Sequence, residues 1–398
     1  PEPASPVDEA ADDEAEFHDS QEAAVATAEG DGDGEAANHE GCLEPESNAL
    51  LPEFQDTEYA QRVLEVIRPI RLATQDIAGR RVHAFGSAVN GFGERSSDID
   101  LVLEAAPAEL CEGLGLGPIP EREVVRRSLG KLHRKLVKEG FVVKERVLMA
   151  KVPILKMQLG PRGSECDLSC NNLLPVFNTR LLKAYADLDE RVVQITHALK
   201  HFAKKRGCHG ASIGHFSSYA MTLLVIFYMQ VRLALPCFQH DADRQPQMYR
   251  EGTRSFNVAM DLGLQAPRSH VDVSFRDFAR YFRDEFKWGT WVVSVRKGEA
   301  LPTEKFPKLG MKYRQGIRGA EAREIMHIED PFDIGRNLNC VLASGSNNRL
   351  WWALLDAADY AGGSAPERPP SSWELEDEKD WPQPASERDA GRGGQRGG

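Results

Sequence analysis

The sequence lacks a long hydrophobic run and any spacing of cysteines typical of a disulfide or zinc framework. Its longest apolar stretch, 219–231, is interrupted by Thr222 and Gln230 and falls short of the roughly 20 residues that cross a bilayer. The seven cysteines are scattered and form no CxxC pair, which favours reduced thiols. We therefore expect an intracellular protein without a membrane span, in the cytoplasm or else in the nucleus or mitochondrion.

Basic residues are absent from the first 50 positions, which hold 16 acidic ones. A segment so acidic and poor in aromatic residues cannot bury enough apolar surface to offset its ordering entropy, so residues 1–50 are predicted to be disordered. The tail 363–398, rich in Pro, Glu, Ser and Gly, is predicted to be disordered too. Between these ends the charge is +7, against −12 for the whole chain. That balance suits a polyanionic partner, and it equally suits an ordinary charged surface.

The pattern between these ends changes once, near residue 175. Before it, short β-rich runs follow a helical pattern at 58–77 in which Pro69 is expected to introduce a kink. The β-rich runs are 81–85, 99–103, 141–148, 152–158 and 166–169, with a helix expected at 121–139. This pattern predicts an α+β domain over 51–175. Residues 176–362 are predicted to be mostly helical, with helices at 191–205, 217–235, 275–286 and 349–360 and an irregular insertion at about 236–272.

Two aspartates separated by one residue follow a glycine-serine turn. A predicted strand runs into Gly86-Ser87, where glycine lets the backbone approach a ligand and a short helix can direct N–H groups at a phosphate. Asp98 and Asp100 then enter the next strand, and residues two apart on a strand face the same side. Two adjacent carboxylates repel each other unless they share a proton or a cation. Hard oxygen ligands suit Mg²⁺, or Mn²⁺, together with substrate phosphates.

A third carboxylate is expected from a neighbouring strand. Asp167 lies between Cys166 and Leu168 on the last β-rich run. Three carboxylates on adjacent strands can hold two metal ions, one activating an attacking hydroxyl and one stabilising a leaving oxygen. A DxD sequence alone is more often a turn or a solvated edge, so the hypothesis depends on the combination of the glycine-serine turn, the DxD strand and the later aspartate.

This arrangement resembles the polymerase-β-type nucleotidyltransferases, and more narrowly the terminal uridylyltransferase and template-independent poly(A) polymerase family. Further stretches similar to family motifs follow in order at 171–173, 177–179, 200–205, 217–220, 292–298 and 328–333. The resemblance covers roughly residues 58–348. It implies a nucleotidyltransferase palm, a mixed sheet with helices, followed by a mostly helical poly(A)-polymerase-associated domain.

The resemblance also implies a set of nucleotide-binding residues. Gly86 and Ser87 would hold the triphosphate, together with the residues Lys200, Lys204 and Ser218. By the same carry-over, Asn178 would bind the ribose 2′-hydroxyl and Tyr219 would stack on the base. The residues alone leave other interpretations open: the two lysines share one face of a predicted helix and could be a solvated helix end. Ser218 could be a helix cap, and Tyr219 could belong to the core.

The stretch 328–339 should approach the edge of the base. In uridylyltransferases acidic residues at positions like Asp330 and Asp333 help to recognise uracil, and a histidine often follows three residues after the second. Here that position is Arg336, which can donate to a uracil carbonyl and equally to an acceptor on cytosine. Asp330 and Asp333 could instead be loop caps. The base preference predicted from this sequence is UTP, with ATP as the alternative.

The resulting hypothesis is an enzyme that adds uridylates to RNA 3′ ends by two-metal-ion catalysis. Alternatives are a poly(A) polymerase with the same site, and a catalytically inactive RNA-binding scaffold of the same fold. No recognisable RNA-binding module occurs between 51 and 362, so the choice of RNA could depend on partner proteins. The sequence does not define the target RNA.

Overall fold

The protein was studied as a computed structural model, which describes residues 58–78, 81–93, 97–117, 119–150, 152–267, 271–311, 325–342 and parts of 349–358. The predicted disordered segments 1–50 and 363–398, and much of the last predicted helix, lie outside the described residues. None of the described helices is long and apolar enough to cross a membrane.

A five-stranded mixed sheet forms the first part of the described chain. Its strands are β1 (Val82–Phe85), β2 (Ile99–Leu103), β3 (Phe141–Val147), β4 (Ile154–Leu159) and β5 (Glu165–Cys170). Their spatial order is β1-β2-β5-β4-β3, with β2 and β5 parallel at the centre and the other pairs antiparallel. The α+β prediction is therefore confirmed, and each predicted β-rich run becomes a strand.

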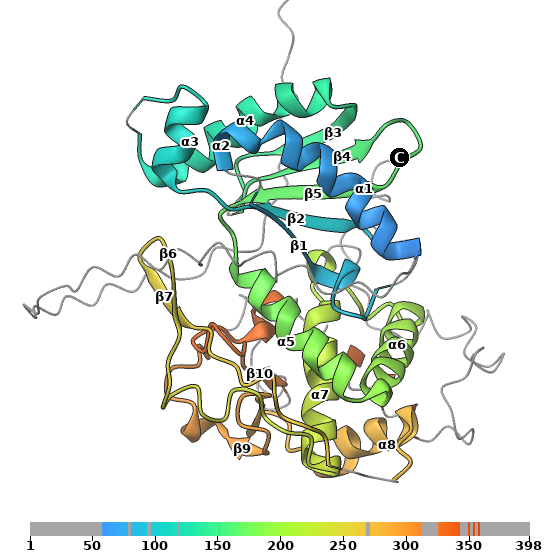
Figure 1. The fold of residues 1–398 in the computed structure, drawn as a ribbon. Coiled ribbons are helices and arrows are strands. Elements are labelled where there is room, and N and C mark those ends of the chain that lie inside the picture. Colours follow the sequence, from blue (N-terminus) through green and yellow to red (C-terminus); the bar gives the residue numbers. More distant parts are fainter. Residues whose placement is uncertain are drawn as a thin grey trace, which may run out of the picture. The chain divides into compact units, whose positions relative to one another are not determined.

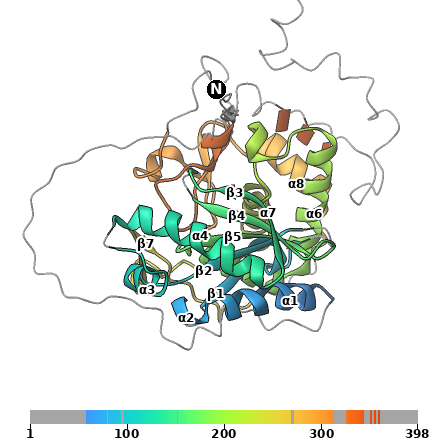
Figure 2. The ribbon, with the colours of Figure 1, turned by 90° about the horizontal axis from the view of Figure 1, so that it is seen from above.

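Helices cover one face of this sheet, as Figure 2 shows. They are α1 (Glu58–Ala73), α2 (Gln75–Ala78), α3 (Pro107–Gly113) and α4 (Glu121–Lys138). Alternate residues of β2, such as Leu101, are fully buried against Leu132 and Leu136 of α4. The intervening residues, Asp100 among them, must therefore point to the opposite face.

The first helix does not break at its proline. It passes Pro69 and ends at Ala73, and Thr74, whose hydroxyl donates to the carbonyl of Ile70 at 2.8 Å, separates it from α2. The helix thus continues past the proline, and a kink of its axis at Pro69 stays a prediction.

The second part of the chain is built on α5 (Leu174–Leu188), α6 (Glu190–Lys205), α7 (Ser218–Leu233) and α8 (Phe275–Arg280) (Figure 1). Helix α7 is apolar on all sides and nearly all of its residues are buried, as expected of a central core helix. The same core includes Val102 of β2, so the helical part packs against the sheet face that carries Asp100.

This second part also contains two small sheets that the sequence did not predict. The supposedly irregular insertion 236–272 holds a hairpin of β6 (Met248–Glu251) and β7 (Arg254–Asn257). A three-stranded sheet joins β8 (Trp291–Val293), β9 (Leu301–Pro302) and β10 (His327–Ile328). These strands have two to four residues, too few to show a reliable alternation of polar and apolar positions.

Two cysteines flank Asp167 on β5, Cys166 and Cys170 being buried in the core beneath the helices. Burial raises the pKa of each thiol to about 12. Because a thiolate is the form that binds zinc or reacts as a nucleophile, these side chains act as small apolar core residues.

Candidate active site

Two of the predicted carboxylates lie side by side at the centre of the sheet. Asp100 of β2 is directly opposite Asp167 in the parallel pairing of β2 with β5, so both side chains point to the sheet face opposite helices α1 to α4, the face against which the helical part packs. Asp98 lies two residues before Asp100 and is exposed, whereas the other two carboxylates are partly buried. The structure thus brings Asp100 and Asp167 to one side of the sheet, with Asp98 just before the start of β2.

Burial and neighbouring charges raise the pKa of Asp100 and Asp167. Burial, followed by the charges of Asp167 and Asp98, raises the pKa of Asp100 to about 7. Burial also raises the pKa of Asp167, while the charge of Lys156 opposes that rise. Neighbouring carboxylates behave in this way when no cation compensates their repulsion.

A closed set of metal ligands is not preformed. Within the described part of the chain, no three His, Cys, Asp or Glu side chains are already grouped as one metal site. The donors available are nevertheless carboxylate oxygens that repel one another, which is the donor chemistry that suits a hard divalent cation. Asp98, Asp100 and Asp167 therefore remain the residues that fit such an ion, with Asp98 the one least held in place.

A lysine completes the row of side chains across this face. Lys156 of β4 lies opposite Asp167 on one side and Glu145 of β3 on the other, and its Nζ is 3.1 Å from Glu145 Oε2. Lys156 was not among the predicted site residues. The alternation in β4, where Leu155 and Met157 are buried and Lys156 is exposed, already placed it on the polar face.

The turn after β1 is shaped around Asp100. Gly86 has φ of +75°, and a Cβ added there would lie 2.4 Å from Asp100 Oδ2, closer than any side chain permits. Its N–H donates to Thr179 Oγ1 of α5 at 2.8 Å. Ser87, in the same short 3₁₀ turn, is partly buried. Thr179 was not recognised from the sequence as a contact of this turn.

The two predicted lysines of α6 differ in their surroundings. Lys200 is buried, 5% exposed, and its Nζ donates to the carbonyl of Phe92 at 3.0 Å. Phe92 belongs to the same loop as Ser87, so Lys200 lies against the segment expected to hold the triphosphate. Lys204, one turn later, is exposed.

At the start of α7, the residue that caps the helix and the residue predicted to bind the triphosphate are two neighbouring serines. The hydroxyl of Ser217 caps the helix by accepting the N–H of Ala220 at 3.2 Å. Ser218 does not have that role, and its Oγ lies 2.9 Å from His209 Nε2. His209 lies in the loop after α6, nine residues before Ser218. No sequence pattern connects the two residues, so this contact was not predicted.

The next residue brings two predicted nucleotide contacts together. The hydroxyl of Tyr219 donates to Asn178 Oδ1 of α5 at 2.9 Å. Burial, followed by the nearby charge of Asp330, raises the pKa of Tyr219 well above its ordinary value. The predicted ribose contact, the predicted base platform and one predicted base-edge carboxylate are therefore neighbours.

The base-edge loop is held by its own aspartates. Asp330 is 1% exposed, and its Oδ1 accepts the backbone N–H groups of Phe332 and Asp333, both at 3.1 Å. Burial raises the pKa of the Asp330 carboxyl, although these two hydrogen bonds oppose the rise. The capping role considered from the sequence is thus present for Asp330, and its charge reaches Tyr219 as well.

The second carboxylate of this loop has a partner on the unpredicted hairpin. Asp333 Oδ2 is 3.1 Å from Arg254 Nη1 of β7. Arg336 is exposed, and its backbone N–H donates to the carbonyl of Asp333 at 2.7 Å. Asp333 is therefore already paired with an arginine that no local sequence pattern connects to it.

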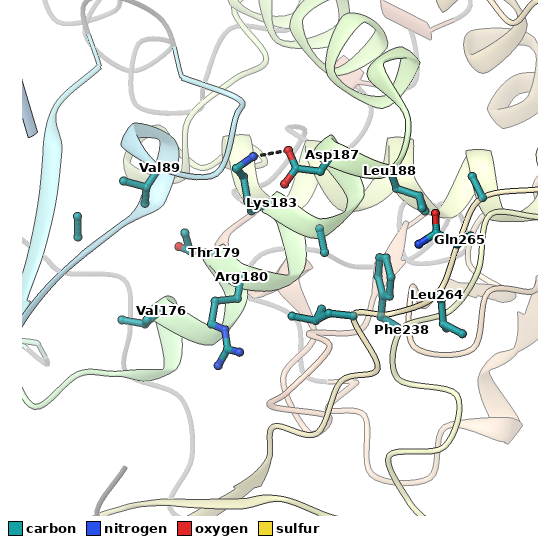
Figure 3. Close-up of a pocket in the computed structure, with 14 residues that line it drawn as sticks. Val89, Val176, Thr179, Arg180, Lys183, Asp187, Leu188, Phe238, Leu264 and Gln265 are labelled. Atoms are coloured by element: carbon teal, nitrogen blue, oxygen red, sulfur yellow. Dashed lines mark hydrogen bonds and ion pairs between the residues drawn. The ribbon is translucent and has the colours of Figure 1, made fainter. Parts of the chain in front are cut away.

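A hollow of about 590 Å³ lies along another face of α5. Figure 3 shows Val176, Thr179, Arg180 and Lys183 beside it, with Lys183 paired to Asp187. None of the residues predicted to bind nucleotide lines it. Consecutive helix residues point about 100° apart, so these side chains and Asn178 occupy different faces of the helix.

Two family models match the chain. The model described as the poly(A) RNA polymerase, mitochondrial-like, central palm domain matches residues 48–187. The model described as Cid1 family poly A polymerase matches residues 273–336.

Curated relatives include both poly(A) polymerases and a uridylyltransferase. Poly(A) RNA polymerase GLD2-B of Xenopus laevis is 31% identical over 299 residues, which are 70% of this chain and 53% of the relative. Terminal uridylyltransferase 7 of Homo sapiens is 30% identical over 300 residues, 72% of this chain and 19% of that protein. The chain therefore spans about half the length of the first of these relatives, and less of the second.

Solved structures of the Cid1 poly(U) polymerase share the fold. One, a mutant bound to MgATP, has a TM-score of 0.59 at 24% sequence identity and covers 77% of this chain and 89% of that one. A complex of Cid1 with the UTP analogue UMPNPP also has a TM-score of 0.59, at 23% identity. The likeness extends over the sheet with its helices and over the helical part.

Proposed function

Because the chain belongs to the nucleotidyltransferase family that includes template-independent poly(A) polymerases and terminal uridylyltransferases, we propose that it adds nucleotides, preferentially uridylates, to RNA 3′ ends. The observation that carries this proposal is the in-register pair Asp100 and Asp167. The charge of Asp167 adds to the effect of burial in raising the pKa of Asp100, as expected of a site prepared for positive charge. An inactive scaffold would have no need to keep these repelling carboxylates together.

The chain's residues divide the work of the reaction between two sides of the nucleotide. Asp98, Asp100 and Asp167 would hold divalent cations, which when bound activate the attacking 3′-hydroxyl and stabilise the leaving pyrophosphate. Before cations arrive, Lys156 offsets part of the negative charge at Asp167. Ser87, on the loop that Lys200 fastens, and Ser218 provide donors for the triphosphate. Catalysis of this kind depends on positioning and charge neutralisation.

The nucleoside would lie against Tyr219 and Asn178. The Tyr219 hydroxyl occupies one lone pair of Asn178 Oδ1 and so fixes the orientation of the amide. The amide N–H₂ is then available as a donor to the ribose 2′-hydroxyl, an arrangement that favours ribonucleotides. Tyr219 presents its ring to the base while its hydroxyl is kept neutral by burial.

The preference for uracil rests on the acceptors of the base-edge loop. Uracil carries a donor at N3, whereas adenine has an acceptor at N1 on the comparable edge. An ionised Asp330 or Asp333 can accept a hydrogen bond from uracil N3–H, whereas it would face the lone pair of adenine N1. The hydrogen bond missing with adenine leaves a buried polar group unpaired, which costs about 1–3 kcal/mol. Arg336 can add a donor to uracil O4.

A tailing assay with each of the four triphosphates separately tests both levels of the proposal. A single-stranded RNA should be extended with Mg²⁺ or Mn²⁺ present, and the double variant Asp100→Asn, Asp167→Asn should be inactive. The matched control Asp241→Asn, Asp261→Asn changes two exposed aspartates and should leave the rate unchanged. Lack of any extension by the parent protein would support the scaffold alternative.

A competition between equimolar UTP and ATP then decides the base. We expect uridylate to dominate by about one to two decades, following the cost of an unpaired buried group. The similarity to GLD2 poly(A) polymerases supports the opposite outcome. If adenylate dominates, the protein is a poly(A) polymerase that uses the same site.

A further inference from the structure

An unusual line of positive charge runs along the outer side of α4. Arg127, Lys131, Arg134 and Lys138 are all exposed and are spaced by four, three and four residues. At 3.6 residues per turn this spacing puts them on one face, and at 1.5 Å per residue the line extends about 16 Å. These four residues are called the α4 stripe below.

Carboxylates do little to neutralise the α4 stripe. Arg127 shares Glu123 with a second arginine. Lys131 donates to two backbone carbonyls of the preceding loop, which keep its charge intact. Arg134 and Lys138 have no ion pair within the residues that the structure describes, whereas the neighbouring Lys135 is paired with Asp76.

Helix stability does not account for this arrangement. Like charges three and four residues apart on a helix destabilise it, and the stripe contains three such consecutive pairs. A cation in the last turn is favoured by the helix dipole, which explains Lys138. The helix dipole does not explain Arg127 and Lys131, which lie about two turns or more before the C-terminal end of α4.

A hollow of about 440 Å³ adjoins the stripe. Arg127 and Lys131 line it, opposite a loop in which Gly115 and Gly117 present only backbone. A Cβ added at either glycine would meet nothing within 4 Å, so this side of the hollow is open. Leu116 and Leu148 also line the hollow, so a polymer backbone has its open approach to the cations across the two glycines.

We propose that the α4 stripe and this hollow bind the phosphate backbone of RNA upstream of the 3′ end, an inference that rests on the proposed function. Most apolar residues of α4 are buried against the sheet, and Val137 alone among those the structure describes is exposed, so the stripe lacks the broad apolar face with which an amphipathic helix enters a lipid surface. A straight row of cations instead matches a regularly charged polymer, and the proposed substrate is one.

The position of the stripe determines which RNA reaches it. Helix α4 covers one face of the sheet (Figure 2), while Asp100 points to the other. Only an RNA long enough to pass round the edge of the sheet can occupy the site and the stripe together. The stripe should therefore strengthen binding of long RNA and leave the tailing of a short oligonucleotide unchanged.

The test variant replaces Arg127, Arg134 and Lys138 together by Gln and retains Lys131, which ties down the preceding loop. Binding of a single-stranded RNA of about 30 nucleotides, longer than usual single-strand site sizes, is measured without nucleotide over a range of salt. We expect binding about 10- to 100-fold weaker, with the slope of log affinity against log salt reduced by about 2. Binding and tailing of an RNA of about 6 nucleotides should be unchanged.

The control variant removes the same charge elsewhere, through Arg280→Gln, Lys305→Gln and Lys308→Gln at exposed positions of the helical part. It should bind both RNAs as the parent does. In the α4 variant the loss of like-charge repulsion offsets the loss of the exposed Arg127–Glu123 pair and of the cation at the helix end, so its Tm should stay close to that of the parent. That result separates lost RNA contact from lost folding.

Three results would overturn the inference. They are unchanged long-RNA affinity in the α4 variant, an equal loss in the control, and binding of the stripe to anionic phosphatidylserine vesicles in preference to RNA. Failure of the parent to tail any RNA contradicts the proposed function instead. The binding comparison without nucleotide still decides whether the stripe contacts RNA.

Discussion

Replacing Gly86 by alanine tests whether Asp100 must occupy its observed position. The added Cβ would lie 2.4 Å from Asp100 Oδ2 and 3.3 Å from its Cγ. The backbone there has φ of +75°, which L-residues adopt at a cost of about 1–2 kcal/mol. Either the turn or the carboxylate must move, because α5 holds the turn through Thr179.

The strain at Gly86→Ala should lower the stability of the fold, and the displacement of Asp100 should lower the rate of tailing. Moving Asp100 off its rotamer adds about 0.5–1.5 kcal/mol to the backbone strain, so unfolding should become easier by about 2–3 kcal/mol. For a chain of this size that lowers Tm by roughly 2–4 °C per kcal/mol. A displacement of about 1 Å at the reacting groups costs about 100-fold in rate, so kcat for tailing should fall by about that factor while RNA affinity is retained.

Gly160→Ala is the matched control. Gly160 also has positive φ, +66°, but a Cβ there meets nothing within 4 Å. This variant should lose about 1–2 kcal/mol of stability from strain alone and keep its kcat. The reasoning is refuted if Gly86→Ala keeps more than about a tenth of the parent kcat, or if both variants lose activity in proportion to their stability.

Three further predictions concern the nucleoside pocket. Tyr219→Phe removes the hydrogen bond to Asn178, worth about 1 kcal/mol, so the ratio of kcat/KM for UTP over dUTP should fall about fivefold; an unchanged ratio contradicts the positioning role. Arg254→Gln releases Asp333, and because the arginine is half exposed, stability should fall by less than about 1 kcal/mol while the UTP-to-ATP ratio changes. An unaltered ratio would place Asp333 outside base recognition. Burial raises the pKa of Asp330, so the native state binds this proton more tightly than the unfolded state, and stability decreases as pH rises from the unfolded to the native pKa. Asp330→Asn should flatten that decrease in a series of Tm measurements against pH, and a parallel profile would show that another group causes it.

The parts of the fold that local patterns specify were predictable. The five strands of the main sheet are short β-rich runs, and their ends were located within two residues. The two-residue repeat of a strand predicted which face Asp100 takes, whereas Asp98 lies just before β2 and its convergence with Asp100 stays a prediction. Helices α6 and α7 have long apolar faces, which is the strongest signal a sequence carries for a helix.

The unpredicted features depend on contacts between distant segments. Nothing local to Asp333 indicates that Arg254, 79 residues away, will pair with it. The parallel pairing of β8 with β10 likewise joins residues near 292 and 327 through strands too short to be recognised alone. The position of Lys156 opposite Asp167 depends on strand register, which the alternation in each strand limits but does not determine.

The loop that follows β1 has two attachments in the helical part of the chain. At its start the N–H of Gly86 donates to Thr179, and at its end the carbonyl of Phe92 accepts from the ammonium of Lys200. A fragment ending before α5 would lose the acceptor for the first and the donor for the second. The sheet domain is therefore not an interchangeable module: in a chimaera, the loop beside Asp100 keeps its shape only when α5 and α6 are transplanted with it.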